Sequence, residues 1–316
     1  MKKVLISRSL PAQVYPLLDG LDVVRRDRTD VLSHDELCAA LRDYDGVICT
    51  LGDQFSAEVF AEVPTPRCRI LANFGVGYNH IDVGAAQAAG LVVTNTPGAV
   101  TDATADVAMT LMLMSARRAG EGERLVRSGG WEGWHPTQML GLHLTGKKVG
   151  IVGMGRIGQA IARRCHHGFD MSVAYFGRSK KALDFDAEYF SDLKALAADV
   201  DVLVTAVPGS AETRHIINAE VLSSMQPHAR LINIARGNVV DQSSLISALK
   251  ANEIGGAGLD VYEFEPEVPQ ALRDLDNVVL LPHLGTSTEE VRVDMGRMAV
   301  ENVQAFLGGG QPANLV

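Results

Sequence analysis

The sequence predicts an α/β fold made of two doubly wound domains, each a parallel sheet with helices on both faces. Short β-branched runs alternate with amphipathic stretches along nearly the whole chain, and such alternation is typical of parallel sheets. At 316 residues the chain is long for a single compact domain. The alternation also restarts once, after residue 98, so two domains are expected.

The first third of the chain carries five candidate strands. Between them lie stretches such as residues 33–44, whose apolar side chains recur at the spacing of a helix. The strands are predicted from their β-branched and apolar composition. They cover residues 4–7, 22–25, 46–50, 69–73 and 91–95.

The second series opens with a long apolar helix over residues 100–118, which we interpret as the crossing between the domains. Thr101 or Asp102 is its expected N-cap. A polar segment, residues 127–141, precedes the next strand, and a final helix over residues 287–307 is expected to pack back on the first domain. The strands of this series are predicted over residues 147–153, 172–176, 201–207, 229–235, 257–262 and 277–282.

Composition and charge limit the kinds of molecule that the chain is expected to bind. The chain is 47% hydrophobic and 21% charged, as in a globular protein with a substantial core. Its net charge of −9 argues against nucleic acid or an anionic membrane as a partner, so an anionic ligand requires a local basic pocket. The first apolar run stops at Arg8, too early for a signal peptide, and no stretch is long enough to span a membrane. A cytoplasmic location is expected.

The cysteines are expected to be small core residues in a reducing compartment. None lies in a CxxC pair, and each lies in or beside an apolar stretch. A disulfide or metal role is the less favoured alternative, and no metal site is predicted. The four residues are Cys38, Cys49, Cys68 and Cys165.

A glycine-rich turn carries the pattern of a dinucleotide-binding site. Gly153, Gly155 and Gly158 have GxGxxG spacing, and they follow an apolar strand and open a helix. Gly153 would make the tight turn, Gly155 would let the backbone approach a pyrophosphate, and Gly158 would allow close helix packing. The amides of Arg156 and Ile157 would face the phosphates from the helix N-terminus. A glycine-rich turn without a ligand is the alternative, which the flanking elements disfavour.

The tip of the next strand bears on the choice of cofactor. The fingerprint rule places Asp or Glu about 20 residues on, where it binds the ribose hydroxyls of NAD. Here the strand over residues 172–176 runs into a basic tip, and no acid appears before Asp184. A basic tip suits a 2′-phosphate, so NADP(H) is predicted over NAD(H), with a solvated basic loop as the alternative. The tip residues assigned to the cofactor are Gly177, Arg178, Ser179 and Lys180.

Three further stretches place polar groups where apolar strands end, which is where doubly wound sheets bind ligands. Arg236 follows one strand and His283 follows the last. Asp260 and Glu265 follow the strand between them. Each residue alone has a plainer alternative, such as a helix cap, an exposed acid or a structural histidine. Together they bring a cation, an acid and an imidazole to neighbouring strand ends, which favours a catalytic site.

With these features the chain resembles the D-isomer-specific 2-hydroxyacid dehydrogenases, and within them the glyoxylate/hydroxypyruvate reductases. The resemblance covers essentially the full length, through motifs in matching order such as FGVGYNHIDV, LTGKKVGIVGMGRIGQAIARR, NIARGNVVD, GLDVYEFEP and LPHLGTST. It implies a Rossmann-type cofactor domain, residues 99–285, inserted in a flavodoxin-like substrate domain, residues 1–98 plus 286–316. It also implies a homodimer and a site in the cleft between the domains.

The resemblance implies roles for the polar residues. His283 would protonate the carbonyl oxygen of a 2-keto acid, and Glu265 would favour the imidazolium form of His283. Arg236 would bind the carboxylate and polarise the carbonyl. Asp260 would contact the nicotinamide carboxamide. Other positions matched to the cofactor are Thr104, Val207, Pro208, Thr213, Ile234, Ala235 and Gly285.

The resemblance also assigns residues to the substrate. The amides of Val76 and Gly77 would bind the other side of the carboxylate, and Leu51 and Gly52 would form part of the pocket wall. Trp134 resembles a tryptophan that reaches the active site of the partner subunit. A dimer-interface or core aromatic is an equally good interpretation of Trp134.

The predicted activity is NADPH-dependent reduction of glyoxylate to glycolate and of hydroxypyruvate to D-glycerate. One alternative is an NAD-dependent D-2-hydroxyacid dehydrogenase that acts on lactate-sized acids or on phosphoglycerate. Another is a non-catalytic NAD(P)-sensing binding protein of the same fold. The complete set of arginine, glutamate and histidine favours an enzyme over the binding protein.

Overall fold

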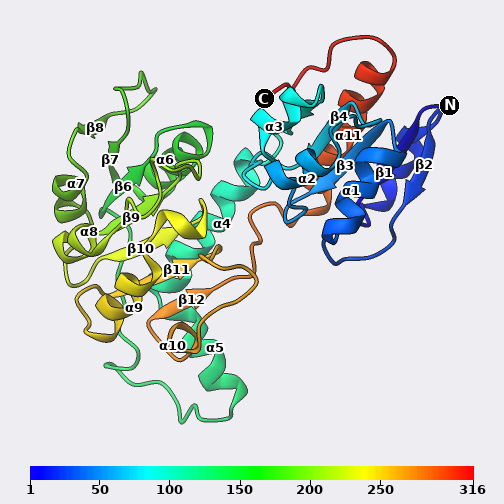
Figure 1. Ribbon diagram of the computed structural model, residues 1–316. Helices are drawn as coiled ribbons and strands as arrows, with labels where there is room; N and C mark the ends of the chain where they lie inside the picture. The colour runs from blue at the N-terminus through cyan, green and yellow to red at the C-terminus, as the bar shows by residue number, and fades with distance from the viewer. The chain divides into compact units, whose positions relative to one another are not determined.

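The computed structural model describes residues 1–316, and the chain divides into two compact units (Figure 1). Unit 1 consists of Met1–Val100 and Thr286–Val316, and unit 2 consists of Thr101–Gly285. Each unit contains one sheet whose paired strands all run parallel, as the alternation of strands and helices predicts. None of the helices combines the length and the apolar character that crossing a membrane requires.

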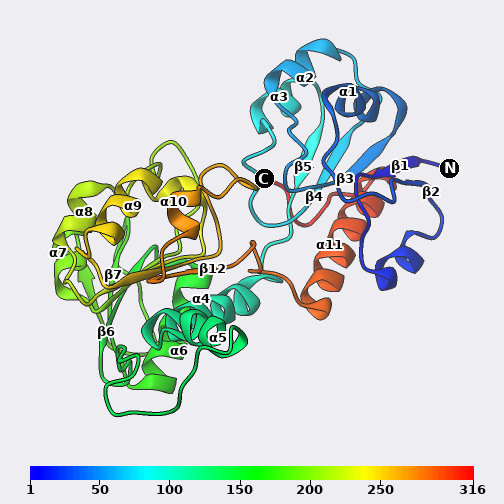
Figure 2. The same ribbon diagram turned by 90° about the horizontal axis from the view of Figure 1, so that it is seen from below.

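Unit 1 is built on a five-stranded sheet in the order β2-β1-β3-β4-β5, which is the flavodoxin-like order. Helices α1 to α3 lie on one face of the sheet and α11 lies on the other (Figure 2). Alternate side chains of each strand serve the two faces, so Leu5 packs towards α1 and Ile6 packs towards α11. The strands are β1 Lys3–Ile6, β2 Asp22–Arg25, β3 Gly46–Thr50, β4 Ile70–Phe74 and β5 Val92–Thr94. The helices are η1 Ala12–Leu18, α1 His34–Asp43, α2 Ala57–Glu62, α3 Val83–Ala88 and α11 Glu289–Leu307.

Unit 2 is built on a seven-stranded sheet in the order β12-β11-β10-β9-β6-β7-β8, the Rossmann order with one strand added. Helices α4 and α6 cover one face, and α7, α8 and α9 cover the other (Figure 2). The strands are β6 Lys148–Val152, β7 Ser172–Phe176, β8 Ala187–Phe190, β9 Val202–Thr205, β10 Arg230–Asn233, β11 Gly256–Leu259 and β12 Val278–Leu280. The helices are α4 Thr101–Ala116, α5 Ala119–Arg127, α6 Arg156–Phe169, α7 Leu193–Asp199, α8 Ala219–Ser224, η2 Gly237–Val239, α9 Gln242–Lys250 and α10 Gln270–Arg273.

The strand order of unit 2 fixes where ligands bind. The connections change direction between β6 and β9, which pair side by side from Val149↔Val202 to Val152↔Thr205. Ligands of doubly wound sheets bind at the carboxyl ends of the strands, next to such a switch point. The loops after β6, β7, β9, β10, β11 and β12 all leave from this carboxyl edge because the strands are parallel.

Helix α4 differs from its prediction at the start. The chain turns over residues 97–100 and helical geometry begins at Thr101, so Thr101 and Asp102 lie inside the first turn. The prediction that one of them is the N-cap is therefore wrong. The Asp102 carboxylate instead forms an ion pair with Arg164 of α6 at 3.0 Å and lies favourably at the positive end of the α4 dipole.

Two elements of unit 2 have no counterpart in the sequence prediction. Strand β8 contains no β-branched residue and pairs with β7 alone, so nothing in its composition marks it as a strand. Helix α5 contains two glycines and begins after Arg118, which has a positive φ of 52° that separates α5 from α4. Arg118 and Glu121 form an ion pair at 2.7 Å that stabilises the first turn of α5.

Candidate active site

The loop after β6 has the geometry that GxGxxG spacing requires. Gly153 has a φ of +102°, a conformation that other residues rarely adopt. A Cβ on Gly158 would lie 2.1 Å from the carbonyl oxygen of Gly153, so only glycine lets α6 pack this closely on the loop. No atom lies within 4 Å of the Cβ position of Gly155, so the backbone is open to a ligand there.

The N-terminus of α6 presents free amides at the same loop. Gly155 is the N-cap and supplies no side-chain acceptor. The first amides of the helix, those of Arg156 and Ile157, therefore have no side-chain cap, and the helix dipole favours negative charge in front of them. The open backbone at Gly155 and these amides fit a dinucleotide pyrophosphate.

The tip of β7 is tied to the glycine loop. The amide of Gly153 donates to the carbonyl oxygen of Phe176 at 2.9 Å. Beyond Phe176, the side chains of Arg178 and Ser179 are exposed and take part in no hydrogen bond or ion pair of the structure. Both are therefore available to an anionic ligand that follows the β6 loop.

Other contacts shape the rest of this tip. The hydroxyl of Tyr189 donates to the carbonyl oxygen of Gly177 at 3.2 Å, and the ammonium of Lys180 lies 5.7 Å from the centre of the Tyr189 ring. Asp184, the first acid after β7, is 3.4 Å from Arg163 of α6. The acid nearest in sequence is thus engaged with a helix and does not neutralise Arg178.

His283 and Glu265 form a hydrogen-bonded pair after β12 and β11. His283 Nδ1 lies 2.8 Å from Glu265 Oε2, while Glu265 Oε1 accepts the amide of Tyr262 at 3.0 Å. Both carboxylate oxygens are therefore fixed, and Nε2 of the imidazole is free to act on a ligand. Burial by itself raises the pKa of Glu265, but the hydrogen bond and charge of His283 and the charge of Arg236 lower that pKa overall. Glu265 is thus a carboxylate at neutral pH.

Arg236 follows β10 and is half-buried. Its Nη1 donates to the carbonyl oxygen of Ala235 at 2.7 Å, and no carboxylate lies within ion-pair distance. Burial lowers the pKa of Arg236, while the charge of Glu265 raises it. A guanidinium remains charged in proteins, so Arg236 presents a partly desolvated cation. Such a cation suits a carboxylate ligand.

Asp260 shapes the turn that carries His283. The Asp260 side chain is 1% exposed and accepts the amides of Leu284 at 2.6 Å and Gly285 at 2.8 Å. Burial raises its pKa, and the two amides oppose that shift. The hydroxyl of Thr104 donates to the carbonyl oxygen of Gly285 at 3.1 Å. The role of Asp260 toward a carboxamide stays a prediction, since both of its oxygens already hold the turn.

The remaining residues matched to the cofactor lie at the same edge of unit 2. A Cβ on Gly153 would lie 2.7 Å from Val207, so the loops after β6 and β9 touch. Thr213 closes the β9 loop because its hydroxyl donates to the carbonyl oxygen of Pro208 at 2.7 Å. Ile234 and Ala235 are buried directly after β10.

Asn233 is a positioning residue that the sequence patterns do not single out. Its Oδ1 accepts the hydroxyl of Thr205 at 2.7 Å and the amide of Ala235 at 3.1 Å. Its Nδ2 donates to the carbonyl oxygen of Arg236 at 3.1 Å. An asparagine at the end of a buried strand, before an arginine, is the signal that could have identified it.

In unit 1, the loop after β4 exposes two amides. The side chain of Asn73 donates to the carbonyl oxygens of Gly75 at 2.9 Å and Gly77 at 3.0 Å. Asn95 donates to the carbonyl oxygen of Val76 at 2.9 Å. The carbonyl groups are thus held by asparagines, while the amides of Val76 and Gly77 donate to no group of the structure. Asn73 and Asn95 are further positioning residues that the sequence analysis does not predict.

The turn after β3 is held by a buried acid. Asp53 is fully buried and accepts the hydroxyl of Ser7 at 2.6 Å and the amide of Thr50 at 2.8 Å. Gly52 has a φ of +97°, and Leu51 is 40% exposed. Leu51 therefore offers an apolar surface on a fixed turn, as a pocket wall requires.

Trp134 lies in unit 2 between α5 and β6 and is 79% exposed. The interpretation of Trp134 as a core aromatic is therefore wrong for the single chain, because its side chain is largely exposed. Its neighbours Trp131 and Leu140 are 53% and 68% exposed. The segment thus presents apolar side chains to its surroundings.

The four cysteines are free and buried, as predicted. Burial raises the pKa of Cys165 to about 12, as expected of an unreactive core thiol. Cys38 lies 3.9 Å from His34 Nε2 and 3.7 Å from Glu62 Oε2, and this trio offers three ligand atoms within 4.8 Å of one another. The three groups already satisfy one another by hydrogen bonds.

Comparison with known proteins gives consistent matches. Residues 109–285 match the family model of the D-isomer specific 2-hydroxyacid dehydrogenase NAD binding domain. The chain is 43% identical over 324 residues to a glyoxylate reductase of Pyrococcus furiosus, covering 99% of this chain and 95% of the relative. It is 35% identical over 313 residues to a glycerate dehydrogenase of Hyphomicrobium methylovorum, covering 98% and 97%.

A solved structure of similar fold contains a cofactor. This is the NADPH-dependent glyoxylate/hydroxypyruvate reductase of Sinorhizobium meliloti in complex with NADP and malonate. It superposes with a TM-score of 0.88 at 37% sequence identity, covering 100% of this chain and 96% of that chain.

Proposed function

Because the chain belongs to the D-isomer-specific 2-hydroxyacid dehydrogenase family, we propose that it reduces glyoxylate and hydroxypyruvate with NADPH. The family makes it an oxidoreductase that acts on a CH–OH group. In the proposed direction a 2-keto acid, NADPH and a proton give a 2-hydroxy acid and NADP⁺. The products are glycolate and D-glycerate. The observation that carries the proposal is the 2.8 Å His283–Glu265 pair at the same sheet edge as Arg236.

His283 supplies the proton. Its Nδ1 is held by Glu265, so Nε2 is the nitrogen that faces a substrate and donates to the carbonyl oxygen. The carboxylate of Glu265 fixes the orientation of the ring that carries this proton. After donation the imidazole is neutral, and a proton from solvent restores it. When bound, the nicotinamide supplies the hydride that completes the reduction.

Arg236 holds the substrate carboxylate. Its guanidinium is partly desolvated and has no carboxylate of the protein within ion-pair distance, so a substrate carboxylate gains a full charge-assisted interaction. The same cation stabilises the negative charge that develops on the carbonyl oxygen during reduction. Contributions from Leu51, Gly52 and the amides of Val76 and Gly77 remain predictions.

The tip of β7 favours NADPH. A 2′-phosphate on the adenosine ribose would meet the exposed Arg178 and Ser179, with Lys180 nearby, and no carboxylate opposes it. The NADP-bound reductase of Sinorhizobium meliloti supports this choice. Remaining residues assigned to the cofactor are Thr104, Gly153, Gly155, Arg156, Ile157, Gly158, Gly177, Val207, Pro208, Thr213, Ile234, Ala235, Asp260 and Gly285.

We also propose a homodimer. One segment exposes the apolar side chains of Trp131, Trp134 and Leu140, which a second copy of the chain would cover. Sedimentation analysis of the purified chain tests this. A monomer at micromolar concentration would contradict it.

The test of the proposed activity is His283→Ala. We expect the rate of glyoxylate reduction to fall by about 10²–10⁴-fold, because the general acid is lost. Binding of NADPH, followed by its fluorescence, should be unchanged. A variant that loses NADPH binding, or that keeps most of its turnover, would assign His283 a structural role instead.

A further inference from the structure

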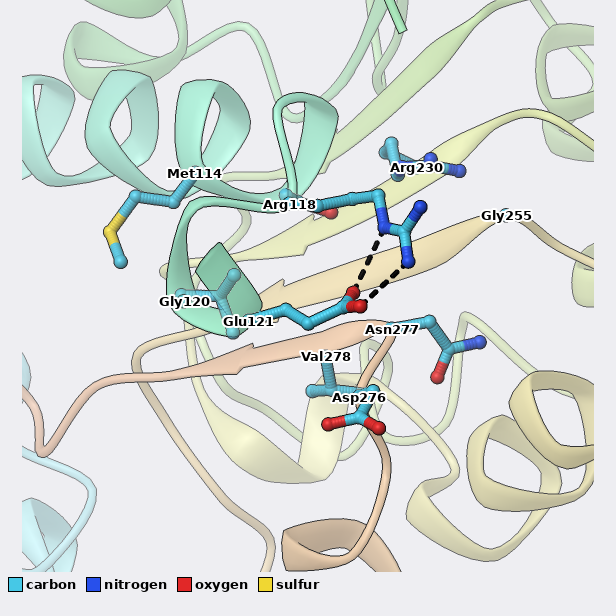
Figure 3. Close-up of a pocket in the computed structure, with 11 residues that line it drawn as sticks. Met114, Arg118, Gly120, Glu121, Arg230, Gly255, Asp276, Asn277 and Val278 are labelled. Carbon is cyan, nitrogen blue, oxygen red and sulfur yellow. Dashed lines mark hydrogen bonds and ion pairs between the residues drawn. The ribbon is translucent and has the colours of Figure 1, made fainter. Parts of the chain in front are cut away.

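Unit 2 contains a cavity of about 310 Å³ at the amino ends of its strands (Figure 3). Its wall includes Arg230, the first residue of β10, together with Gly255 before β11 and Asn277 before β12. The end of α4 and the start of α5 form the other side. Because all strands run parallel, this cavity lies at the opposite sheet edge from the candidate active site of unit 2.

Arg230 is a buried cation without a counter-charge. The residue is 9% exposed and forms no ion pair with any carboxylate of the structure. Its Nη1 donates to the carbonyl oxygen of His228 at 2.9 Å, while its Nε is buried and donates to nothing. A buried charge without a partner is costly, so a structure that keeps one is expected to supply a counter-ion by another route.

The backbone is shaped to admit this side chain. A Cβ on Gly255 would lie 1.6 Å from Arg230 Nη1, so any other residue at position 255 would displace the guanidinium. A Cβ on Gly256 would lie 3.4 Å from Arg230 Cδ. Gly255 and Gly256 therefore leave space for the side chain of Arg230, whose guanidinium group lies at the cavity.

Other charged groups at the cavity are balanced in pairs. Arg118 donates to both carboxylate oxygens of Glu121, at 2.9 and 2.7 Å (Figure 3). Asp276 forms an ion pair with Arg124 at 2.8 Å. The wall itself is neutral, with two cations, Arg118 and Arg230, and two anions, Glu121 and Asp276, but Arg230 is its one cation with no carboxylate within ion-pair distance. Burial lowers the pKa of Arg230, and the like charge of Arg118 lowers it further.

A second polar group at the cavity also lacks a partner. Ser115 of α4 lines the cavity and is 6% exposed, and its hydroxyl forms no hydrogen bond. A buried hydroxyl without a partner costs free energy for the same reason as the buried Nε of Arg230. Both atoms are covered by the surrounding protein, so neither is open to the cavity as the two side chains lie.

We propose that this cavity is a second, non-catalytic site that binds a phosphate-type oxyanion through Arg230. A guanidinium matches the geometry of phosphate oxygens. The volume exceeds that of inorganic phosphate, and small-molecule sites start at about this size, so a small phosphate monoester also fits. The oxyanion supplies the guanidinium of Arg230 with the counter-charge that no carboxylate of the protein provides.

The test is calorimetric titration of the full-length protein with inorganic phosphate in a phosphate-free buffer. We expect Arg230→Met to weaken phosphate binding by about tenfold or more, because a charge-assisted interaction is lost. The matched control is Arg273→Met, which removes the same charge from an exposed arginine of α10 that does not line the cavity. The control should bind phosphate as the wild type does.

A thermal measurement adds a signature that general damage to the fold would not produce. Phosphate should raise the Tm of the wild type but not that of Arg230→Met, since only a ligand that binds the folded state stabilises it. Without phosphate, the Arg230→Met variant should melt no lower than the wild type, because a buried charge without a partner is removed.

Several results would overturn the proposal. Absence of phosphate binding to the wild type would do so, as would equal affinity in wild type and Arg230→Met. Binding that disappears in Arg178→Ala and persists in Arg230→Met would locate the anion at the tip of β7. A parallel titration with glycerol phosphate distinguishes the sources, since tighter binding than inorganic phosphate identifies a monoester ligand and equal or weaker binding identifies free phosphate.

Discussion

Two arginines border the same short strand, and their surroundings differ. Arg230 is the first residue of β10, and Arg236 follows its end, so one lies at the amino edge of the sheet and the other at the carboxyl edge. Burial lowers the pKa of both. The nearby charge is negative for Arg236, from Glu265, and positive for Arg230, from Arg118.

The charged groups around a buried cation indicate what that cation binds. Arg236 lies near a carboxylate that offsets part of its desolvation cost while leaving the guanidinium free for a substrate. Arg230 has no such support, and a glycine pair holds its place open. We infer that each arginine binds an anion. At the carboxyl edge the anion is a reactant, and at the amino edge it is a ligand that does not react.

Of the two arginines, the one at the carboxyl edge should have the larger effect on catalysis when it is replaced. We expect Arg236→Gln to lower kcat/KM for glyoxylate by about 10²–10³-fold, because both carboxylate binding and stabilisation of the developing charge are lost. Phosphate affinity measured by calorimetry should stay at the wild-type value. Loss of phosphate binding in Arg236→Gln with glyoxylate kinetics intact would reverse the two assignments.

The next effect concerns the charge beside Arg236. The pKa of Glu265 lies below its ordinary 4.5, so the carboxylate is charged above 4.5 and is neutralised only as the pH falls through the lowered value. Glu265→Gln removes that charge at every pH and weakens the hydrogen bond that orients His283. We expect about a tenfold lower kcat at neutral pH. The loss of wild-type activity as the pH falls through the lowered pKa of Glu265 should be absent in this variant.

The pH–rate profile of Glu265→Gln is the measurement that checks this pairing. An acidic limb that persists unchanged in Glu265→Gln would show that this limb does not arise from Glu265. Glu265→Asp serves as the comparison, since it keeps a titrating carboxyl group and should keep an acidic limb.

A smaller effect is expected at the tip of β7. Arg178→Ala should raise the KM for NADPH by about tenfold while the KM for NADH changes little, because only NADPH carries the 2′-phosphate. Lys181→Ala is the matched control, since it removes one positive charge from an exposed position nearby that is not assigned to the cofactor. Equal effects of the two variants on the KM for NADPH would mean that the tip acts through its total positive charge and not through a contact between Arg178 and the 2′-phosphate.

Local pattern accounts for much of the fold. Strands β2, β3 and β7 occupy the residues predicted for them, since β-branched runs bounded by polar residues mark them clearly. The φ of Gly153 and the tight packing of Gly158 follow from a motif whose spacing has a physical reason. The Rossmann and flavodoxin-like strand orders agree with the fold class that the resemblance implies.

The features that the local sequence pattern could not predict depend on contacts between residues far apart in the sequence. Arg230 and Gly255 are far apart in the sequence, and they meet only because β10 and β11 pair with Arg230 opposite Gly256. The hydrogen bonds of Asn233 and Asp53 also depend on neighbouring strands and turns. Strand β8 was missed because an edge strand needs little intrinsic preference when β7 supplies its hydrogen bonds.

Initial rates of glyoxylate reduction with NADPH and with NADH test the central claim most directly. The carboxyl edge of unit 2 is proposed to join a His283–Glu265 acid pair, a carboxylate-binding Arg236 and an NADPH-selective Arg178. We predict turnover with both cofactors and a kcat/KM for NADPH about tenfold or more above that for NADH. Absence of turnover with either cofactor, or a tenfold preference for NADH, would contradict the account.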